Sequence, residues 1–221
     1  MSPYSITEAH IKAAQYLHGK MDNWRQTDQA LKDVGQKFPR NDKIGSVYLK
    51  ASLLNGSYAT FLYYAVYDVA VEIVRIFKDT PEVDGRTLVT RLAQVRIGGK
   101  KRLSFASKYA HFFHCDAPPI FDRYAAIALA KHLGKPDDTY YADANYELYC
   151  KAVGELLEQS AIRPEPRKLD RYLWLRGMLD TYRKWYSSDR QGSHGINKEA
   201  FKLFESQDSD LKAALADLEQ R

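Results

Sequence analysis

The sequence predicts an all-α protein. Apolar residues recur at helical spacing in most segments, no segment alternates apolar and polar residues as a β-strand does, and glycine or proline separates the segments. The chain has 221 residues, 45% of them hydrophobic and 28% charged, as in an ordinary globular protein. This length can bury one core or two smaller ones. We therefore expect a single all-α domain over residues 1–221, a helical bundle that can be built as two lobes.

The N-terminal part of the chain predicts two amphipathic helices and then a buried one. The first covers 7–21, where Thr7 opens a capping pattern. The second covers 24–38 and ends before a proline. The third segment, 43–77, is apolar almost all round, so it should form one central buried helix, or two abutting helices that break at Gly56.

Turn signals separate the remaining helices. The helical pattern is interrupted at intervals along the second half of the chain by Gly-Gly, Pro-Pro, a lone glycine and the two prolines of "RPEPR". The helices expected between these signals cover 86–95, 103–113, 123–134, 145–162, 168–186 and 198–220. Two polar residues on the buried segment, Asn55 and Tyr58, need partners there, and we expect structural hydrogen bonds for both.

The positive charge of the protein is concentrated in one segment. The net charge is +5, and residues 85–115 hold seven lysines and arginines but no aspartate or glutamate. The rest of the chain holds 26 basic and 28 acidic residues, so the whole excess lies in this segment. A basic patch of this kind suits a polyanion such as DNA, because each neutralised phosphate releases counterions. The alternative is a solvated charged face that pairs with acids from elsewhere in the fold.

Cysteine usage and hydropathy predict a cytoplasmic protein. Cys115 and Cys150 are the two cysteines, too few for a disulfide framework or a four-cysteine cluster. No uncharged apolar run approaches the length of a membrane span, and the first residues lack the layout of a signal peptide. We expect a monomer that does not contact the membrane.

The basic segment contains a helix, a tight turn and a second helix. Gly98 and Gly99 allow the backbone to turn sharply and to approach a partner closely. The amides that begin the second helix then carry the positive end of its dipole, beside Lys100, Lys101 and Arg102. This arrangement predicts a binding site for DNA phosphates.

The order "LAQVRIGGKKRLSFASKYAHFF" followed by "PPIFDRYAAIAL" resembles the core of the helix-hairpin-helix DNA glycosylases. The closest likeness is to a prokaryotic branch described as 8-oxoguanine DNA glycosylase-like, which "LLNGSYAT" and "KLDRYLW" also fit. The resemblance covers roughly residues 45–185. It implies a DNA-repair enzyme that flips an oxidised purine out of the duplex and excises it, with or without cleavage of the abasic strand.

The resemblance also assigns roles to particular residues. It implies that Lys108 is the nucleophile and Asp122 the carboxylate that stabilises the sugar cation. The residues implied to bind DNA are Arg96, Gly98, Gly99, Lys100, Lys101, Arg102 and Ser104, and those implied to line the base pocket are His114, Asp170 and Trp174. No organic cofactor is implied, although the hairpin carbonyls of some relatives hold a monovalent cation.

Two features depart from the family pattern. The hairpin reads "RIGGKKR" in place of an apolar-Pro-Gly-apolar-Gly pattern, and only 14 positions separate Lys108 from Asp122. Lys100 or Lys101 is therefore an alternative nucleophile. A lysine attacks only as the neutral amine, which burial among the aromatic residues of 105–113 would favour by desolvation.

Structural interpretations stand beside these roles. Lys108 could pair with Asp122 in a structural ion pair, and Asp122 could be a helix N-cap. The protein could then be a non-catalytic DNA-binding module, or could dock an acidic protein through the basic segment. The sequence "HFFHCD" also holds His111, His114, Cys115 and Asp116, but no second His/Cys cluster follows at a ligand spacing, so we expect no metal site.

Overall fold

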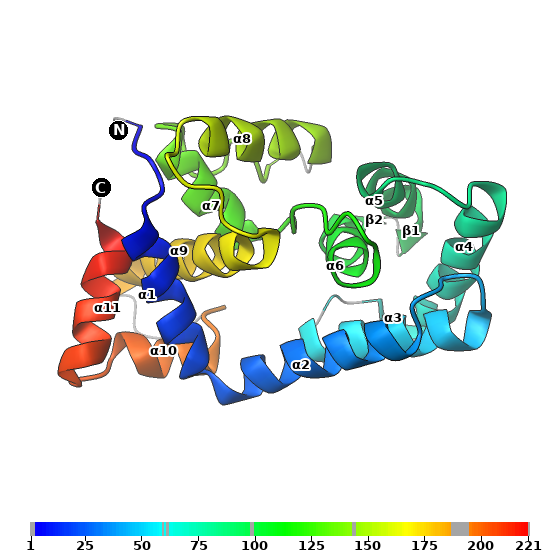
Figure 1. Cartoon of the computed structure of the whole chain (residues 1–221), viewed down its shortest axis with the longest axis horizontal. Coiled ribbons are helices and arrows are strands. Elements are labelled where there is room, and N and C mark those ends of the chain that lie inside the picture. The colour runs from blue at the N-terminus through cyan, green and yellow to red at the C-terminus, as the bar shows by residue number, and fades with distance from the viewer. Residues whose placement is uncertain are drawn as a thin grey trace. The chain divides into compact units, whose positions relative to one another are not determined.

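The computed structural model describes residues 3–58, 60, 62–97, 100–142, 145–186 and 195–220. The fold is all-α, as predicted, and its described elements are helices apart from one pair of two-residue strands (Figure 1). Among these residues no helix combines the length and the apolar character that crossing a bilayer requires. The helices are α1 (Glu8–Gly19), α2 (Asp22–Lys37), α3 (Ile44–Tyr58), η1 (Tyr63–Ala65), α4 (Val66–Asp79), α5 (Gly85–Gln94), α6 (Leu103–Phe113), α7 (Arg123–His132), α8 (Tyr146–Glu158), α9 (Pro166–Tyr186), α10 (Lys198–Phe204) and α11 (Ser209–Glu219).

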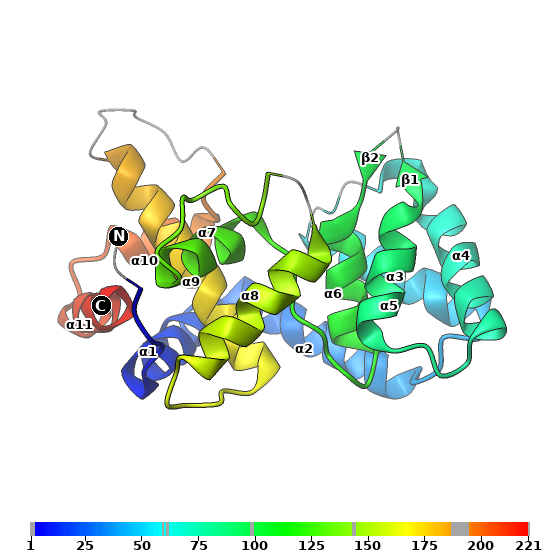
Figure 2. The same ribbon diagram turned by 90° about the horizontal axis from the view of Figure 1, so that it is seen from above.

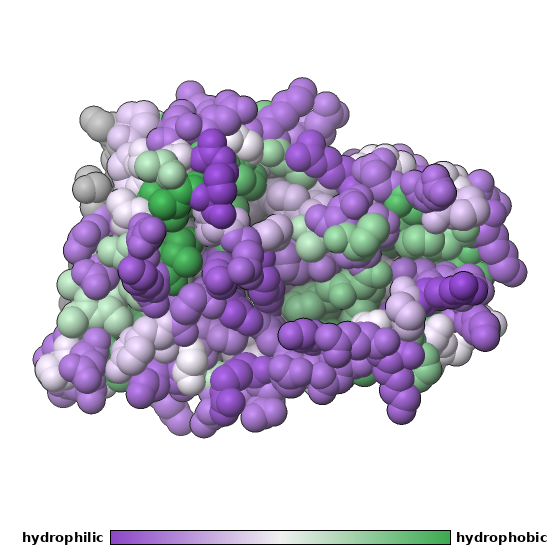
Figure 3. All heavy atoms as spheres, in the orientation of Figure 1, coloured by the Kyte–Doolittle hydropathy of each residue, from purple (hydrophilic) through white to green (hydrophobic). Residues whose placement is uncertain are grey.

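The chain divides into two compact units. The first, here the terminal unit, combines Met1–Arg25 with Asp122–Arg221, and the second, the central unit, is Gln26–Phe121. Helix α2 begins in the terminal unit and continues into the central one. The visible face of α2 is almost entirely hydrophilic, as its polar sequence requires (Figure 3).

The terminal unit is built on the close approach of α7 and α9. Four alanines of α7 are fully buried, which lets another backbone come near. On α9, Gly177 faces the backbone of Tyr124, and a Cβ atom added to this glycine would lie 1.8 Å from the Tyr124 carbonyl oxygen. Only glycine fits at this contact. Helices α1 and α11 pack against each other, and both contact α9.

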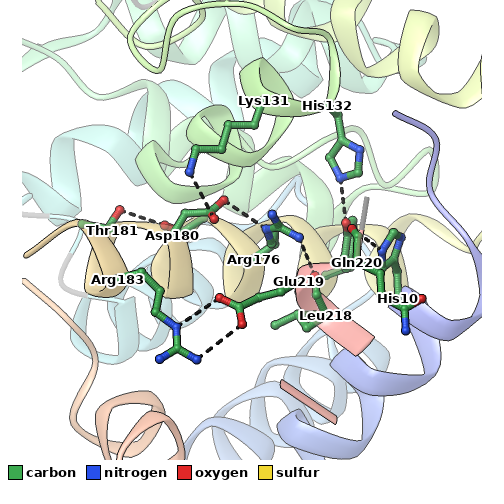
Figure 4. Close-up of polar contacts among 12 residues, drawn as sticks. His10, Lys131, His132, Arg176, Asp180, Thr181, Arg183, Leu218, Glu219 and Gln220 are labelled. Carbon is green, nitrogen blue, oxygen red and sulfur yellow. Dashed lines mark hydrogen bonds and ion pairs between the residues drawn. The ribbon is translucent and has the colours of Figure 1, made fainter. Parts of the chain in front are cut away.

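Hydrogen bonds and ion pairs connect the residues near the N-terminus and near the C-terminus to α7 and α9 (Figure 4). The Arg176 guanidinium is almost fully buried, pairs with Asp180 at 3.1 Å and donates to the carbonyl of Leu218 at 2.7 Å. Asp180 also accepts from Lys131 at 3.1 Å. His132 bonds through one ring nitrogen to the Tyr4 carbonyl at 2.8 Å.

The central unit is arranged around α6. Every residue of α6 except Ser104 and Phe112 is buried, and α5 and α3 pack on it. Asn55 and Tyr58 make the expected structural bonds: the Asn55 amide oxygen accepts from Thr60 and from the backbone of Leu62, and Tyr58 donates to Asp28 at 2.8 Å.

Four expectations about the elements are wrong. The apolar segment 43–77 is interrupted after Tyr58, not at Gly56, which lies exposed inside α3. It is also not buried all round, because six large apolar side chains are exposed on it: Ile44, Tyr48, Leu49, Tyr64, Tyr67 and Val71. The C-terminal segment forms two helices, since Asp208 caps a new one. Strands β1 (Arg96–Ile97) and β2 (Lys100–Lys101) occupy the turn that was expected to lack strands.

Substituting Gly177 by Ala tests the contact between α7 and α9. The added carbon collides with the Tyr124 carbonyl, and overpacking of this severity should lower the free energy of unfolding by about 3 kcal/mol or more. Gly154→Ala is the matched control, because that glycine lies within α8 with open space beside it. The control should gain up to ~1 kcal/mol from helix propensity. Urea unfolding measures both, and equal stability of the two variants would contradict the packing.

Acid should destabilise the protein through His132. Burial is the largest influence on the pKa of His132 and lowers it to about 4. The hydrogen bond to Tyr4 and the charge of Asp180 act in the opposite direction, whereas Arg176 and His10 lower the pKa further. Between the unfolded value near 6.5 and this folded value, the unfolded chain binds more protons, so stability falls as pH drops. The loss attributable to His132 should reach the order of 3 kcal/mol at pH 4.

Urea unfolding between pH 4 and pH 8 checks this dependence. His132→Gln cannot titrate, so its stability should change less steeply over that range than that of the wild type. An unchanged slope would show that other groups cause the acid sensitivity.

Candidate nucleic-acid interface and catalytic lysine

The basic turn joins α5 to α6 through a short strand pair. Helices α5 and α6 lie side by side, and β1 and β2 lie at the same end of both (Figure 2). The strands are antiparallel, with Arg96 opposite Lys101 and Ile97 opposite Lys100. Gly98 and Gly99, expected to bind DNA, lie outside the described residues, and only the backbones of Arg96 and Lys100 are described. Two antiparallel residue pairs therefore set the geometry at the base of the turn.

The N-terminus of α6 lacks the aspartate cap that begins both the preceding helix, α5, and the following helix, α7. Asp84 caps α5 and Asp122 caps α7, each through a carboxylate that accepts backbone amides. The N-cap residue of α6 is Arg102, whose side chain makes no capping hydrogen bond. Arg102 is half-buried and Lys101 is exposed. The first turn of α6 thus combines the positive end of a helix dipole with cationic neighbours, which suits a phosphate.

Lys108 lies on α6, one turn after Ser104, with 5% of its surface exposed. Its ammonium group donates to the Ser104 hydroxyl at 2.8 Å. The same nitrogen lies 5.7 Å from the centroid of the Tyr58 ring, and the Tyr58 hydroxyl is held by Asp28. Ser104, expected to contact DNA, therefore positions the lysine that was expected to be the nucleophile.

Asp122 is the N-cap of α7, which was one of the two structural roles expected for it. One carboxylate oxygen accepts from the Tyr124 amide at 2.9 Å. The preceding residue, Phe121, donates its amide to the Ser107 hydroxyl at 2.9 Å, beside Lys108 on α6. Asp122 opens the second segment of the terminal unit, whereas Lys108 belongs to the central unit.

The two residues expected in the base pocket from α9 have partners within the terminal unit. Asp170 is buried and pairs with Arg167. The Trp174 ring lies 3.9 Å from that of Trp24, centroid to centroid, and 6.4 Å from that of Tyr124. Asp170 is thus paired inside the unit, whereas Trp174 is half-buried and held by its contacts with the two neighbouring rings.

His114, the third expected pocket residue, lines a cavity in the central unit. The cavity measures about 730 Å³, and His114 donates from its Nε2 atom to the Val83 carbonyl at 2.8 Å at its wall. Four carboxylates line the same cavity, contributed by Asp42, Glu82, Asp84 and Asp116. His111 lies elsewhere, with its Nδ1 atom 2.9 Å from the Pro118 carbonyl. Three acids that flank the basic segment in sequence, Glu82, Asp84 and Asp116, are therefore gathered at this cavity together with Asp42.

Sequence reasoning missed a buried polar cluster beside the cavity. The amide oxygen of Asn41 accepts from Lys50 and from Tyr109, each at 2.8 Å, and its nitrogen donates to the Phe113 carbonyl at 3.1 Å. Burial lowers the pKa of Lys50 to about 8. The signal in the sequence was a lysine inside the apolar run 47–54, which had to find a partner once that run was buried.

The N-terminal half of the chain is similar to a known family. A family model described as HI_0787_N, an N-terminal domain, matches residues 8–117, just under half of the chain. The matched part contains the basic segment and Lys108 and ends before Asp122. No curated protein and no solved structure matches the chain. The name of the family indicates neither an activity nor a ligand.

The capping role of Asp122 predicts a difference between two substitutions. Asparagine caps a helix about as well as aspartate, so Asp122→Asn should unfold within about 0.5 kcal/mol of the wild type. Asp122→Ala loses the bond to the Tyr124 amide and should be less stable by ~1 kcal/mol. Chemical denaturation measures both variants, and equal losses would show that the bond contributes nothing.

Proposed function

We propose that the protein is a DNA-repair glycosylase of the helix-hairpin-helix type, which excises an oxidised purine such as 8-oxoguanine from duplex DNA. The observation that carries this proposal is the construction of α6. This helix begins beside cationic residues and has no side-chain cap. One turn after Ser104 it carries the buried Lys108. The basic segment around it holds the whole excess of positive charge.

In this mechanism the helix end binds phosphate and the lysine attacks the sugar. The first-turn amides of α6, with Lys101 and Arg102, hold the backbone of a strand whose damaged nucleotide is flipped from the stack. The Lys108 ammonium first gives a proton to solvent, and the neutral amine forms a bond to C1′ as the glycosidic bond breaks; the nitrogen then loses a second proton, which the departing base takes up. Ring opening converts the adduct to a Schiff base, which water hydrolyses or which permits strand cleavage.

Ser104 and Asp122 have supporting roles. The Ser104 hydroxyl accepts a hydrogen bond from the Lys108 nitrogen and holds it beside the helix until the substrate arrives. The carboxylate of Asp122 offsets the positive charge that develops on the sugar, and its capping bond fixes its direction. Lys101 and Lys100 remain the alternative nucleophiles.

The second candidate function is a DNA-binding module without catalysis. Asp122 has a structural role as a cap, and Lys108 has a hydroxyl partner and an aromatic face within its own unit. These contacts are what a purely structural pair of residues would make. Under this alternative the basic turn still binds duplex DNA, but no lesion is processed.

Borohydride trapping separates these functions. Full-length protein is mixed with labelled duplexes that carry 8-oxoguanine or an abasic site, and sodium borohydride is added. We expect a covalent protein–DNA adduct that Lys108→Gln abolishes, because glutamine cannot form a Schiff base. Lys78→Gln is the control: Lys78 is an exposed lysine of the same unit, in α4, and its loss should leave trapping unchanged.

Every other outcome identifies a different mechanism. An adduct that survives in Lys108→Gln but disappears in Lys101→Gln or Lys100→Gln moves the nucleophile to the turn. Base release without an adduct, lost in the well-capped Asp122→Asn, indicates a glycosylase that activates water. Salt-dependent duplex binding with neither adduct nor base release on any lesion overturns the enzymatic proposal in favour of the DNA-binding module.

A further inference from the structure

Three consecutive residues at the C-terminal end of α6 converge on one point. His114, Cys115 and Asp116 each offer one ligand atom, and these atoms all lie within 4.8 Å of one another. The side chain of His114 is only 8% exposed, whereas Cys115 and Asp116 are exposed. Imidazole nitrogen, thiolate sulfur and carboxylate oxygen are the three ligand types that zinc takes in proteins.

The separations between these atoms approach those of a tetrahedral metal centre. The Nδ1 atom of His114 lies 3.8 Å from the Cys115 sulfur and 3.5 Å from an oxygen of Asp116. The sulfur lies 3.6 Å from the other oxygen of Asp116. Zinc bond lengths in tetrahedral geometry require ligand atoms about 3.3–3.7 Å apart. Small side-chain rotations would therefore complete three of the four positions.

The histidine is held in the tautomer that a metal needs. Its Nε2 atom lies 2.8 Å from the carbonyl oxygen of Val83, so the proton is on Nε2 and the lone pair is on Nδ1. Metal-bound histidines usually donate their second nitrogen to a carbonyl or carboxylate in this way. The contact that Nδ1 now accepts, from the Asp116 amide, is long at 3.2 Å and is the one that metal binding would replace.

The groups around these three residues orient Asp116, add negative charge and leave space for a fourth ligand. The Gly85 amide donates to Asp116 at 2.9 Å and, as the largest influence, lowers the pKa of that carboxyl. The three residues also line the cavity of about 730 Å³, together with the carboxylates of Asp42, Glu82 and Asp84 and one arginine, Arg40. A fourth ligand, either water or one of these carboxylates, has room on the cavity side.

We propose that His114, Cys115 and Asp116 bind a divalent transition-metal ion, with Zn²⁺ as the favoured occupant. Nitrogen, sulfur and oxygen ligands together favour zinc over magnesium or calcium, which take oxygen alone. Binding converts the Cys115 thiol to a thiolate, and the released proton passes to solvent. This differs from the expectation that the chain has no metal site, and it is independent of any reaction at Lys108.

Cobalt substitution tests the proposal on the full-length, reduced protein. We expect one equivalent of Co²⁺ to give the intense visible bands of tetrahedral cobalt and an ultraviolet thiolate-to-cobalt band, both removed by one equivalent of Zn²⁺. Cys115→Ser should lose the thiolate band, and Asp116→Asn should lose roughly tenfold or more in Zn²⁺ affinity measured by calorimetry. Cys150→Ser is the matched control, because that cysteine is buried in α8 and should leave both signals intact.

The same experiment can overturn the proposal. Weak octahedral cobalt bands without a thiolate band, or a Zn²⁺ affinity that Cys115→Ser leaves unchanged, would show that these residues hold no metal. Cys115 is exposed, and Asp116→Asn keeps an oxygen that can accept from the Gly85 amide, so both variants should fold, which circular dichroism checks. A second readout is alkylation: Zn²⁺ should slow the reaction of Cys115 with iodoacetamide, and an unchanged rate would contradict ligation.

Discussion

The amide side chain of Asn41 joins three segments of the central unit. It lies in the connection between α2 and α3, accepts from Lys50 on α3 and from Tyr109 on α6, and donates to the last carbonyl of α6, at Phe113. Asn41 is 6% exposed, so without its amide the Tyr109 hydroxyl and the Phe113 carbonyl would be buried without this partner, whereas Lys50 would keep its bond to the Arg40 carbonyl. Such groups cost about 1–3 kcal/mol each. Burial accordingly raises the pKa of Tyr109 and lowers that of Lys50.

Once α6 is fixed in this way, its two ends acquire opposite electrostatic character. Cationic residues and uncapped amides surround its N-terminus, where the dipole is positive. At its C-terminus, where the dipole is negative, four carboxylates line a cavity. His114 and Asp116 tie this end to the start of α5, through Val83 and Gly85. An anion is therefore favoured at one end and a cation at the other, in agreement with the two proposed ligands.

The sequence predicted the elements better than it predicted their contacts. Turn signals placed α6 at its observed bounds, since the Gly-Gly turn precedes Leu103 and the Pro-Pro turn follows Phe113. The break after Tyr58 could not be foreseen, because Asn55 causes it by accepting bonds from residues beyond the helix. The division of the C-terminal helix follows from a local cap at Asp208, a residue type that helices also carry internally.

For the candidate sites too, the sequence predicted residues better than it predicted their contacts. The sequence proposed Lys108 and Asp122 as candidates by residue type and order, but it did not predict that the Ser104 hydroxyl and the Tyr58 ring lie beside the lysine. The sequence also predicted no metal site at His114, because no second His/Cys cluster follows at the spacing that is usual for zinc ligands. The three adjacent residues lie in a turn after α6, which a hydrogen bond from the Ala117 amide to the His114 carbonyl closes at 3.3 Å.

The two proposed sites can act independently although they share one helix. Ser104 and His114 are ten positions apart, which corresponds to roughly 15 Å along an α-helix. Exposed charges interact weakly beyond the Debye length, about 8 Å at physiological ionic strength. A metal at the C-terminal end would then change the binding of phosphate at the other end little through its charge. Any coupling between them would have to pass through the position of α6 itself, which Asn41 holds at the end nearer the metal.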